Sequence, residues 1–115
     1  MTEPQPFDVE FSRGALRDLD EIGSYMAQVR SGDDAEALIA ALLDRAESLR
    51  TFPHRGSAPA DLTDLDETGF RQILHRHYRI IYLVRGSMVR VVLVADGRRD
   101  IRALLQERLA PDPPA

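Results

Sequence analysis

The segment that most constrains the fold lies at residues 78–96, where the chain reads YRIIYLVRGSMVRVVLVAD. Two apolar runs rich in valine, isoleucine and tyrosine flank a short Arg-Gly-Ser turn, and these residue types favour the pleated backbone of a strand. Glycine in so tight a connection can adopt the backbone angles that a hairpin turn requires. The segment therefore predicts a β-hairpin, and a hairpin is stable only when further strands or helices cover it.

The first part of the chain predicts a strand and a helix. At residues 7–11 the sequence FDVEF alternates apolar and acidic side chains, a pattern typical of a strand with one wet face. Ser12 then caps a predicted helix, and we expect its apolar stripe to face a core, with Tyr25 on or near it. The stripe consists of Leu16, Leu19, Ile22, Met26 and Val29.

A second helix is predicted to begin at Asp33, where Glu36 completes a capping box, and to end before Pro53. The connection between the two helices is short, so they are expected to form an antiparallel hairpin. Residues 53–69 are rich in proline, glycine and aspartate and predict a loop.

The remaining segments complete an α+β domain. Residues 70–75 form another strand-like run, and the spacing of apolar residues in 101–109 predicts a short C-terminal helix. We expect one domain over residues 1–115. In it the N-terminal strand and the helical hairpin pack on a mainly antiparallel sheet of three or four strands. Flexible tails are expected at 1–6 and 110–115.

Composition excludes several kinds of site. The chain has no cysteine for disulfides or thiolate metal sites and no lysine, so all fifteen basic side chains are arginines. Residues 1–69 carry fifteen acidic and six arginine side chains, whereas residues 70–115 carry nine arginines and four acidic side chains. A polyanion contact is therefore expected only in the second half. No metal or cofactor is expected. No apolar stretch approaches the roughly 20 residues that span a bilayer, and a cytoplasmic protein is expected.

The predicted hairpin register indicates which side chains share a face of the sheet. A turn centred on residues 86–87 pairs Tyr82 with Val91. By the same register, Arg79 faces Val94. The face expected in the core holds Tyr78, Ile80, Tyr82, Val84, Val89, Val91, Leu93 and Ala95. The other face is expected to form a shallow groove with an apolar middle of Ile81, Leu83, Val92 and Val94.

Charged side chains lie at one end of this groove. His77 is expected opposite Asp96, with Arg79 diagonal to the same carboxylate. Arg98 and Arg99 follow in the next loop. One interpretation is an ion pair that finishes a strand end. The other is a cluster of guanidinium groups that binds a phosphate or a partner's carboxylate, and the residues alone leave both open.

The stretch YRIIYLVRGSMVRVVLVADGRRDIRALL resembles the RelE/ParE superfamily of toxins from bacterial type II toxin–antitoxin systems. The segments YRIIY and GRRD are the most specific part of the resemblance, and the order of elements agrees over nearly the whole chain. The resemblance implies a small α+β toxin that a cognate antitoxin neutralises by wrapping an extended segment over it.

The superfamily divides by target. RelE-like members cut messenger RNA on the ribosome, and the resemblance places Arg79 and Arg99 at two of their arginine positions, with His77 as a candidate for proton transfer. This chain departs from that set, because it has no lysine, carries Leu105 at the tyrosine position and has Asp96 where many relatives have histidine. The ParE-like branch, which inhibits DNA gyrase, is therefore favoured. A RelE-like ribonuclease is the alternative, and an inactive homologue that only binds an antitoxin is a second alternative.

The resemblance also implies where partners would bind. We expect a hetero-oligomer in which the antitoxin covers the groove and brings acidic side chains to Arg79 and Arg90. The groove residues concerned are Ile81, Leu83, Val92 and Val94. Arg98 and Arg99 are expected to contact a phosphate or a partner. The second partner is DNA gyrase, or the ribosome and its messenger RNA in the alternative, and no membrane contact is expected.

Overall fold

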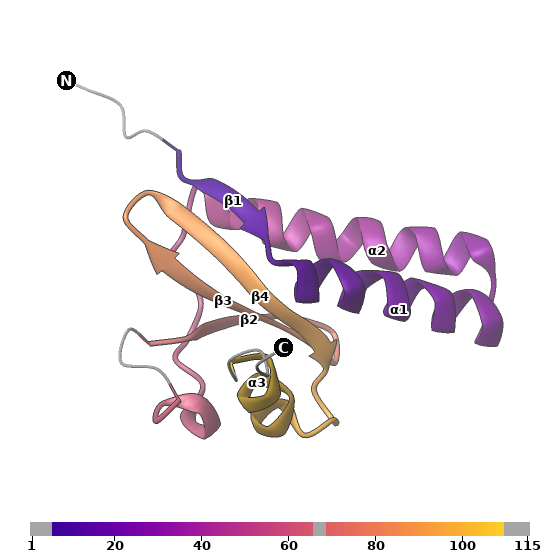
Figure 1. The fold of residues 1–115 in the computed structure, drawn as a ribbon. Helices are drawn as coiled ribbons and strands as arrows, with labels where there is room; N and C mark the ends of the chain where they lie inside the picture. Colours follow the sequence, from indigo (N-terminus) through magenta and orange to yellow (C-terminus); the bar gives the residue numbers. More distant parts are fainter. Residues whose placement is uncertain (1–5, 66–68, 110–115) are drawn as a thin grey trace, which may run out of the picture.

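A computed structural model describes residues 6–65 and 69–109 of the chain (Figure 1). Its helices are α1 (Arg13–Val29), α2 (Gly32–Glu47) and α3 (Ile101–Leu109). Its strands are β1 (Asp8–Phe11), β2 (Arg71–His75), β3 (Tyr78–Arg85) and β4 (Met88–Asp96). The sheet has the order β1-β4-β3-β2, with β1 parallel to β4 and the other pairs antiparallel. The expected α+β architecture is confirmed.

The tails expected at 1–6 and 110–115 lie outside the described residues, except for Pro6. Within the described ranges, no helix is both long enough and apolar enough to cross a membrane.

Serine side chains set the starts of the two hairpin helices. Ser12 caps α1 as predicted, and its hydroxyl accepts a hydrogen bond from Ala15 N at 3.1 Å. The predicted cap at Asp33 is wrong, because the hydroxyl of Ser31 accepts the corresponding bond from Asp34 N at 3.0 Å. Serine and aspartate are comparable caps, and the earlier residue is the one used. Asp33 lies instead in the first turn, where its charge is favourable with the helix dipole.

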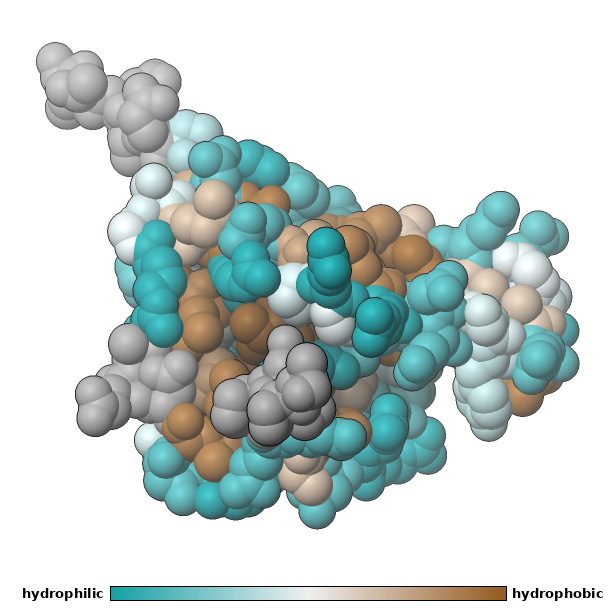
Figure 2. Space-filling view, in the orientation of Figure 1, coloured by the Kyte–Doolittle hydropathy of each residue, from teal (hydrophilic) through white to brown (hydrophobic). Residues whose placement is uncertain are grey.

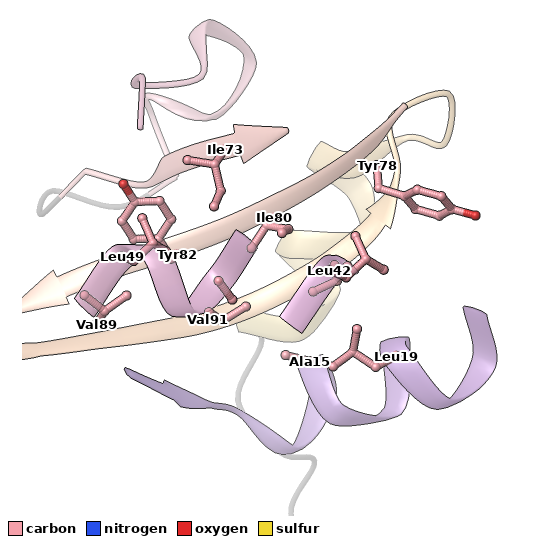
Figure 3. Close-up of a cluster of buried hydrophobic side chains, with 12 residues drawn as sticks. Ala15, Leu19, Leu42, Leu49, Ile73, Tyr78, Ile80, Tyr82, Val89 and Val91 are labelled. Atoms are coloured by element: carbon pink, nitrogen blue, oxygen red, sulfur yellow. The ribbon is translucent and has the colours of Figure 1, made fainter. Parts of the chain in front are cut away.

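Different elements cover the two faces of the sheet (Figure 1). The hairpin of α1 and α2 packs on one face, and α3 packs on the other beside a short 3-10 helix at Ala60–Leu62. The hairpin-side core, drawn in Figure 3, consists of Ala15, Leu19, Leu42, Ala46, Leu49, Ile73, Tyr78, Ile80, Tyr82, Val89, Val91 and Val94. The α3-side core consists of Leu62, Phe70, Ile81, Leu83, Val92, Leu93, Ala95, Ile101 and Leu105.

A β-bulge changes the register expected for the β3–β4 hairpin. Near the turn the pairing is as predicted, but between Tyr82 and Ile81 it shifts by one residue, so that Ile81 faces Leu93 and Arg79 faces Ala95. One extra residue in a strand moves every later side chain to the opposite face. Val94 therefore lies in the hairpin-side core and Leu93 in the α3-side core, which is the reverse of the prediction.

The loop between α2 and β2 is tied to the sheet through a buried tyrosine. The Tyr82 hydroxyl accepts a hydrogen bond from Gly56 N at 3.0 Å, and burial raises the pKa of Tyr82. A Cβ at position 56 would lie 2.5 Å from this hydroxyl and from the Gln72 carbonyl oxygen, so only glycine fits there. Ser57 and Gln72 exchange two backbone hydrogen bonds beside it, at 3.1 and 2.9 Å.

The far end of the helical hairpin projects beyond the sheet and away from the rest of the molecule (Figures 1 and 2). The expectation that the whole stripe of α1 faces a core is therefore wrong at this end, where Val29 is about half exposed. It is also wrong at Leu16 near the start of α1, which is about half exposed although Leu19 is buried. Tyr25, which was expected in the core, is 64% exposed. Apolar side chains at this end are left without cover from the described chain.

Candidate functional site

The groove expected on the second face of the sheet is filled by α3. Ile81, Leu83 and Val92 are buried in the α3-side core, and Val94 lies on the other face. The expectation of an open groove is thus wrong for the described chain, because the amphipathic C-terminal helix covers these side chains itself. Contact of the four residues with an antitoxin stays a prediction.

Arg79 is held on the α3 side by groups of its own chain. Its guanidinium donates to both carboxylate oxygens of Asp61, at 3.0 and 3.1 Å, and to Gln72 Oε1 at 2.7 Å. The Arg79 side chain is only 15% exposed, and its hydrogen bond and charge lower the pKa of Asp61. The predicted contact of Arg79 with Asp96 is wrong, because the bulge places the two side chains on opposite faces. Three of the five guanidinium donors of Arg79 are thus engaged within the chain.

Asp96 lies on the hairpin side, with Arg98 and His77. Arg98 donates to the Asp96 carboxylate from its backbone N at 2.9 Å and from its guanidinium at 2.6 Å. His77 Nε2 lies 3.6 Å from the same carboxylate, so the two residues are close together as expected, although the strand partner of Asp96 is Tyr78. These contacts, with the Arg98 hydrogen bond foremost, lower the pKa of Asp96 to about 2. The carboxylate is therefore charged at neutral pH.

The remaining arginines of interest differ in their surroundings. Arg90 forms an ion pair with Glu10, its neighbour across β1 and β4, and is about half exposed. Arg98 is paired with Asp96 but is mostly exposed. The Arg99 side chain is exposed and has no hydrogen bond or ion pair with any described residue. Among the arginines expected to contact partners, Arg99 has its guanidinium fully available.

Side chains from α1 and α3 close the outer edge of β4 where β1 ends. β1 pairs only with the first half of β4, which leaves backbone groups near the bulge without a strand partner. Asp18 accepts from Val94 N at 2.9 Å and from two guanidinium nitrogens of Arg108 at 2.6 and 2.9 Å. Arg108 also donates to the Val92 carbonyl at 2.9 Å. This clasp satisfies the edge of β4 and holds α3 against α1.

Sequence reasoning misses Asp18 and Arg108. Asp18 lies between Ala15 and Leu19 on the inward side of α1, and an acidic residue in a buried stripe is the signal that could have found it. Gly14 is a second signal, because a Cβ there would lie 2.7 Å from Arg108 Nε. Arg108 crosses α1 at Gly14, where the absence of a side chain leaves room for it.

Three adjoining hollows follow α1 from the far end of the hairpin to the N-terminus of the helix. Their volumes are about 530, 360 and 570 Å³. The first and second share Tyr25, Tyr78, Asp96 and Arg98. The second and third share Asp18, Glu21 and Arg99. Figure 3 shows the Tyr78 ring at the margin of the hairpin-side core with its hydroxyl pointing away from it. We call the three hollows together the α1 trough.

The residues of the ribonuclease alternative do not converge. His77 lies on the hairpin side, Arg79 lies on the α3 side, and Arg99 is exposed in the loop before α3. Leu105, at the position of the tyrosine, is buried in the α3-side core. In the part of the chain that the structure describes, no three histidine or acidic side chains converge as a metal site would require.

The fold agrees with two solved structures of toxin–antitoxin proteins. A chain from the chromosomal ParDE system of P. aeruginosa superposes with a TM-score of 0.68 and 16% identity, over 81% of this chain and 98% of that chain. A chain from the RelBE2 toxin–antitoxin complex of Mycobacterium tuberculosis superposes with a TM-score of 0.61 and 21% identity, over 82% and 94%. At such identities these likenesses concern the fold.

Sequence comparison assigns the family. No curated protein sequence matches this chain. Residues 9–101, however, match the family model described as the ParE toxin of type II toxin–antitoxin system, parDE. This match spans most of the 115 residues. Together with the α+β fold, it shows that the chain belongs to the ParE toxin family of type II toxin–antitoxin systems.

Proposed function

We propose that this chain is a cytoplasmic toxin that inhibits DNA gyrase, and that a cognate antitoxin neutralises it in a hetero-oligomeric complex. Membership of the ParE family supports the gyrase target over the ribosome. In this proposal the toxin binds gyrase and stalls it with its DNA broken, and it needs no catalytic residue of its own.

The surroundings of Arg79 are the observation that carries the proposal. A ribonuclease of the RelE type would use this guanidinium to stabilise charge on the scissile phosphate. Here three of its donor contacts go to Asp61 and Gln72, and the side chain is largely buried. A phosphate would have to displace a bidentate carboxylate, which is among the stronger hydrogen-bonded pairs in proteins.

Two further features disfavour RNA cleavage at this site. The charged Asp96 carboxylate beside His77 would repel a phosphate, and its pKa of about 2 keeps it charged at neutral pH. The terminal helix offers the buried Leu105 in place of a tyrosine, and the chain has no lysine to assist.

The proposal is tested by inducible expression in a bacterial host that lacks the antitoxin. We expect growth arrest, filamentation and induction of the SOS response, with protein synthesis continuing in the first minutes. With the purified chain, gyrase and supercoiled plasmid, we expect linear DNA to accumulate when cleavage complexes are trapped. The folded double variant Arg79→Ala with Arg99→Ala should keep both effects.

Other outcomes would identify the alternatives. Early translation arrest with cuts in ribosome-bound messenger RNA, abolished in the same double variant, would contradict the gyrase target and support the ribonuclease. Normal growth during expression of a folded chain that still binds the antitoxin would mean that the toxin is inactive.

A further inference from the structure

The α1 trough combines apolar and basic side chains that lack partners in the described chain. Its first hollow lies under the projecting end of the hairpin and includes Tyr25 and Val29, which are 64% and 51% exposed. Apolar side chains so exposed at the rim of a hollow are typical of a surface that another molecule covers. Phe52 is equally exposed but does not line the trough. It therefore serves as a control for exposure of an aromatic ring elsewhere on the surface.

The distribution of arginines points to the same surface. Most arginines of the chain contact acidic side chains, a hydroxyl or backbone carbonyls. Within residues 6–65 and 69–109, four arginine side chains have no hydrogen bond or ion pair, namely Arg13, Arg17, Arg76 and Arg99. All four line the trough: Arg76 in the first hollow, Arg99 in the second and third, and the other two in the third. The unmatched positive charge of the described chain is thus collected along one side of α1.

The acidic side chains of the trough do not cancel this charge. Asp18 is paired with Arg108, Asp96 with Arg98, and Asp34 with Arg30. Glu21 and Glu107 are the acidic lining residues without an ion pair among the described residues. Four free arginines against two free glutamates leave a positive surplus, which fits a partner that brings carboxylates.

We propose that the α1 trough binds the cognate antitoxin through a segment that combines acidic side chains with an apolar or aromatic one. The acidic side chains pair with Arg17 and Arg99, and the apolar side chain enters the hollow beside Tyr25. This proposal rests on the antitoxin named in the proposed function but not on the gyrase target. A protein segment fits better than a nucleic acid, because the surplus is small and the hollow at the hairpin end is largely apolar.

The geometry also sets the spacing of that segment. Arg17 and Tyr25 are eight residues apart on α1, which corresponds to about 12 Å along the helix axis. An extended segment covers this distance in about four residues and a helical segment in about eight. Acidic and apolar anchors at one of these spacings are therefore expected in the antitoxin.

The test is a binding measurement between purified full-length toxin and purified full-length antitoxin, taken as the product of the open reading frame that adjoins the toxin gene. We expect Tyr25→Ala to weaken binding by about 30-fold, as for a central aromatic anchor. Arg17→Glu and Arg99→Glu should each weaken it by about tenfold or more, whereas Arg17→Lys and Arg99→Lys should stay within a few-fold of wild type. Phe52→Ala is the matched control and should not change the affinity. Thermal unfolding of each variant verifies that it is folded.

Three outcomes would each contradict one part of this proposal. Folded Tyr25 and arginine variants that bind the antitoxin as tightly as wild type would overturn the trough as its site. Variants that bind normally but lose toxicity would assign the trough to the toxin's target instead. Failure of the wild-type chain to bind the antitoxin would overturn the neutralisation stated in the proposed function. Because this assay contains no gyrase, a failure of the gyrase proposal leaves its outcome unchanged.

Discussion

The α3 side of the sheet and the α1 trough both contain arginines and apolar side chains, but the two regions differ in how many arginines are paired and in how far the apolar side chains are buried. On the α3 side, Arg79 and Arg102 pair with Asp61 and Asp64 of the preceding loop, and Leu105 is fully buried. Along the trough, four arginines have no partner among the described residues, and the apolar side chains beside them are exposed. On the α3 side the chain pairs Arg79 and Arg102 with its own carboxylates. Along the trough it pairs Arg30, Arg98 and Arg108 but leaves the other four arginines without a partner among the described residues.

This contrast gives a way to separate structural from functional arginines in a small toxin. An arginine that matches a family position is available for binding only when its donors are not already used by its own chain. By this criterion we interpret Arg79 as a structural residue and propose Arg99 as a contact residue, although both belong to the stretch that resembles the superfamily.

We expect the greatest loss of stability when a buried side chain of the α3 side is truncated, and almost none when an exposed side chain of the trough is truncated. Leu105→Ala should lower the free energy of unfolding by about 3 kcal/mol, because it opens a cavity under α3. Tyr25→Ala should change it by less than about 0.5 kcal/mol, because the ring is mostly exposed. Urea denaturation measures both. Equal losses in the two variants would mean that the trough is part of the core.

The clasp between α1 and α3 should give the next largest effect. Arg108→Ala should lower the free energy of unfolding by about 2 kcal/mol, because it leaves the partly buried Asp18 carboxylate without its cation.

A double-mutant cycle of Gly14→Ala with Arg108→Ala tests the contact between Arg108 and α1 directly. In the wild-type background Gly14→Ala should destabilise the protein, because its Cβ meets the Arg108 guanidinium. In the Arg108→Ala background it should be neutral or stabilise by about 0.5 kcal/mol, because alanine is the better helix former. Additive losses would show that Arg108 does not cross α1 at Gly14.

The Asp96 ion pair at the trough predicts a smaller, pH-dependent contribution. The folded-state pKa of Asp96 is about 2, below its ordinary value of 3.8, so the stabilisation is fully present above about pH 4 and is lost as the pH falls towards 2. Its size should be about 1 kcal/mol, because Arg98 is largely exposed and solvent screens the pair. Unfolding measured between pH 2 and 6 should show this slope in the wild type. An unchanged slope in Arg98→Ala would exclude this pair as its source.

The smallest effect is expected at Asp61. Asp61→Asn keeps the size of the side chain and one oxygen that can accept from Arg79, but it removes the charge. It should cost only about 0.5 kcal/mol, since one hydrogen bond is retained and this carboxylate is half exposed. Toxicity should be unchanged if Arg79 is structural. A gain of RNA cleavage in this variant, measured on ribosome-bound messenger RNA, would instead show that Asp61 masks a working arginine.

Local features of the fold were predictable from the sequence, whereas one irregularity was not. The Ser12 cap and the turn before Met88 depend on neighbouring residues, and both are as predicted. The bulge opposite Tyr82 and Ile81 could not be recognised from the composition of β4, because the neighbouring residues 91–94 are all apolar and suit a strand on either face. That single extra residue exchanged the faces of Leu93 and Val94 and separated Arg79 from the carboxylate expected to pair with it.

The order of elements, the hairpin of helices, the strand pairing near the turn and the resemblance to the ParE family follow from local patterns and short motifs, so the sequence was enough to predict them. Which charges are matched depends on the folded chain. Contacts such as Arg79 with Asp61 and Arg108 with Asp18 join residues 18 and 90 positions apart. Such pairs depend on the strand register and on where α3 packs, and neither is encoded in the spacing of residues along the chain.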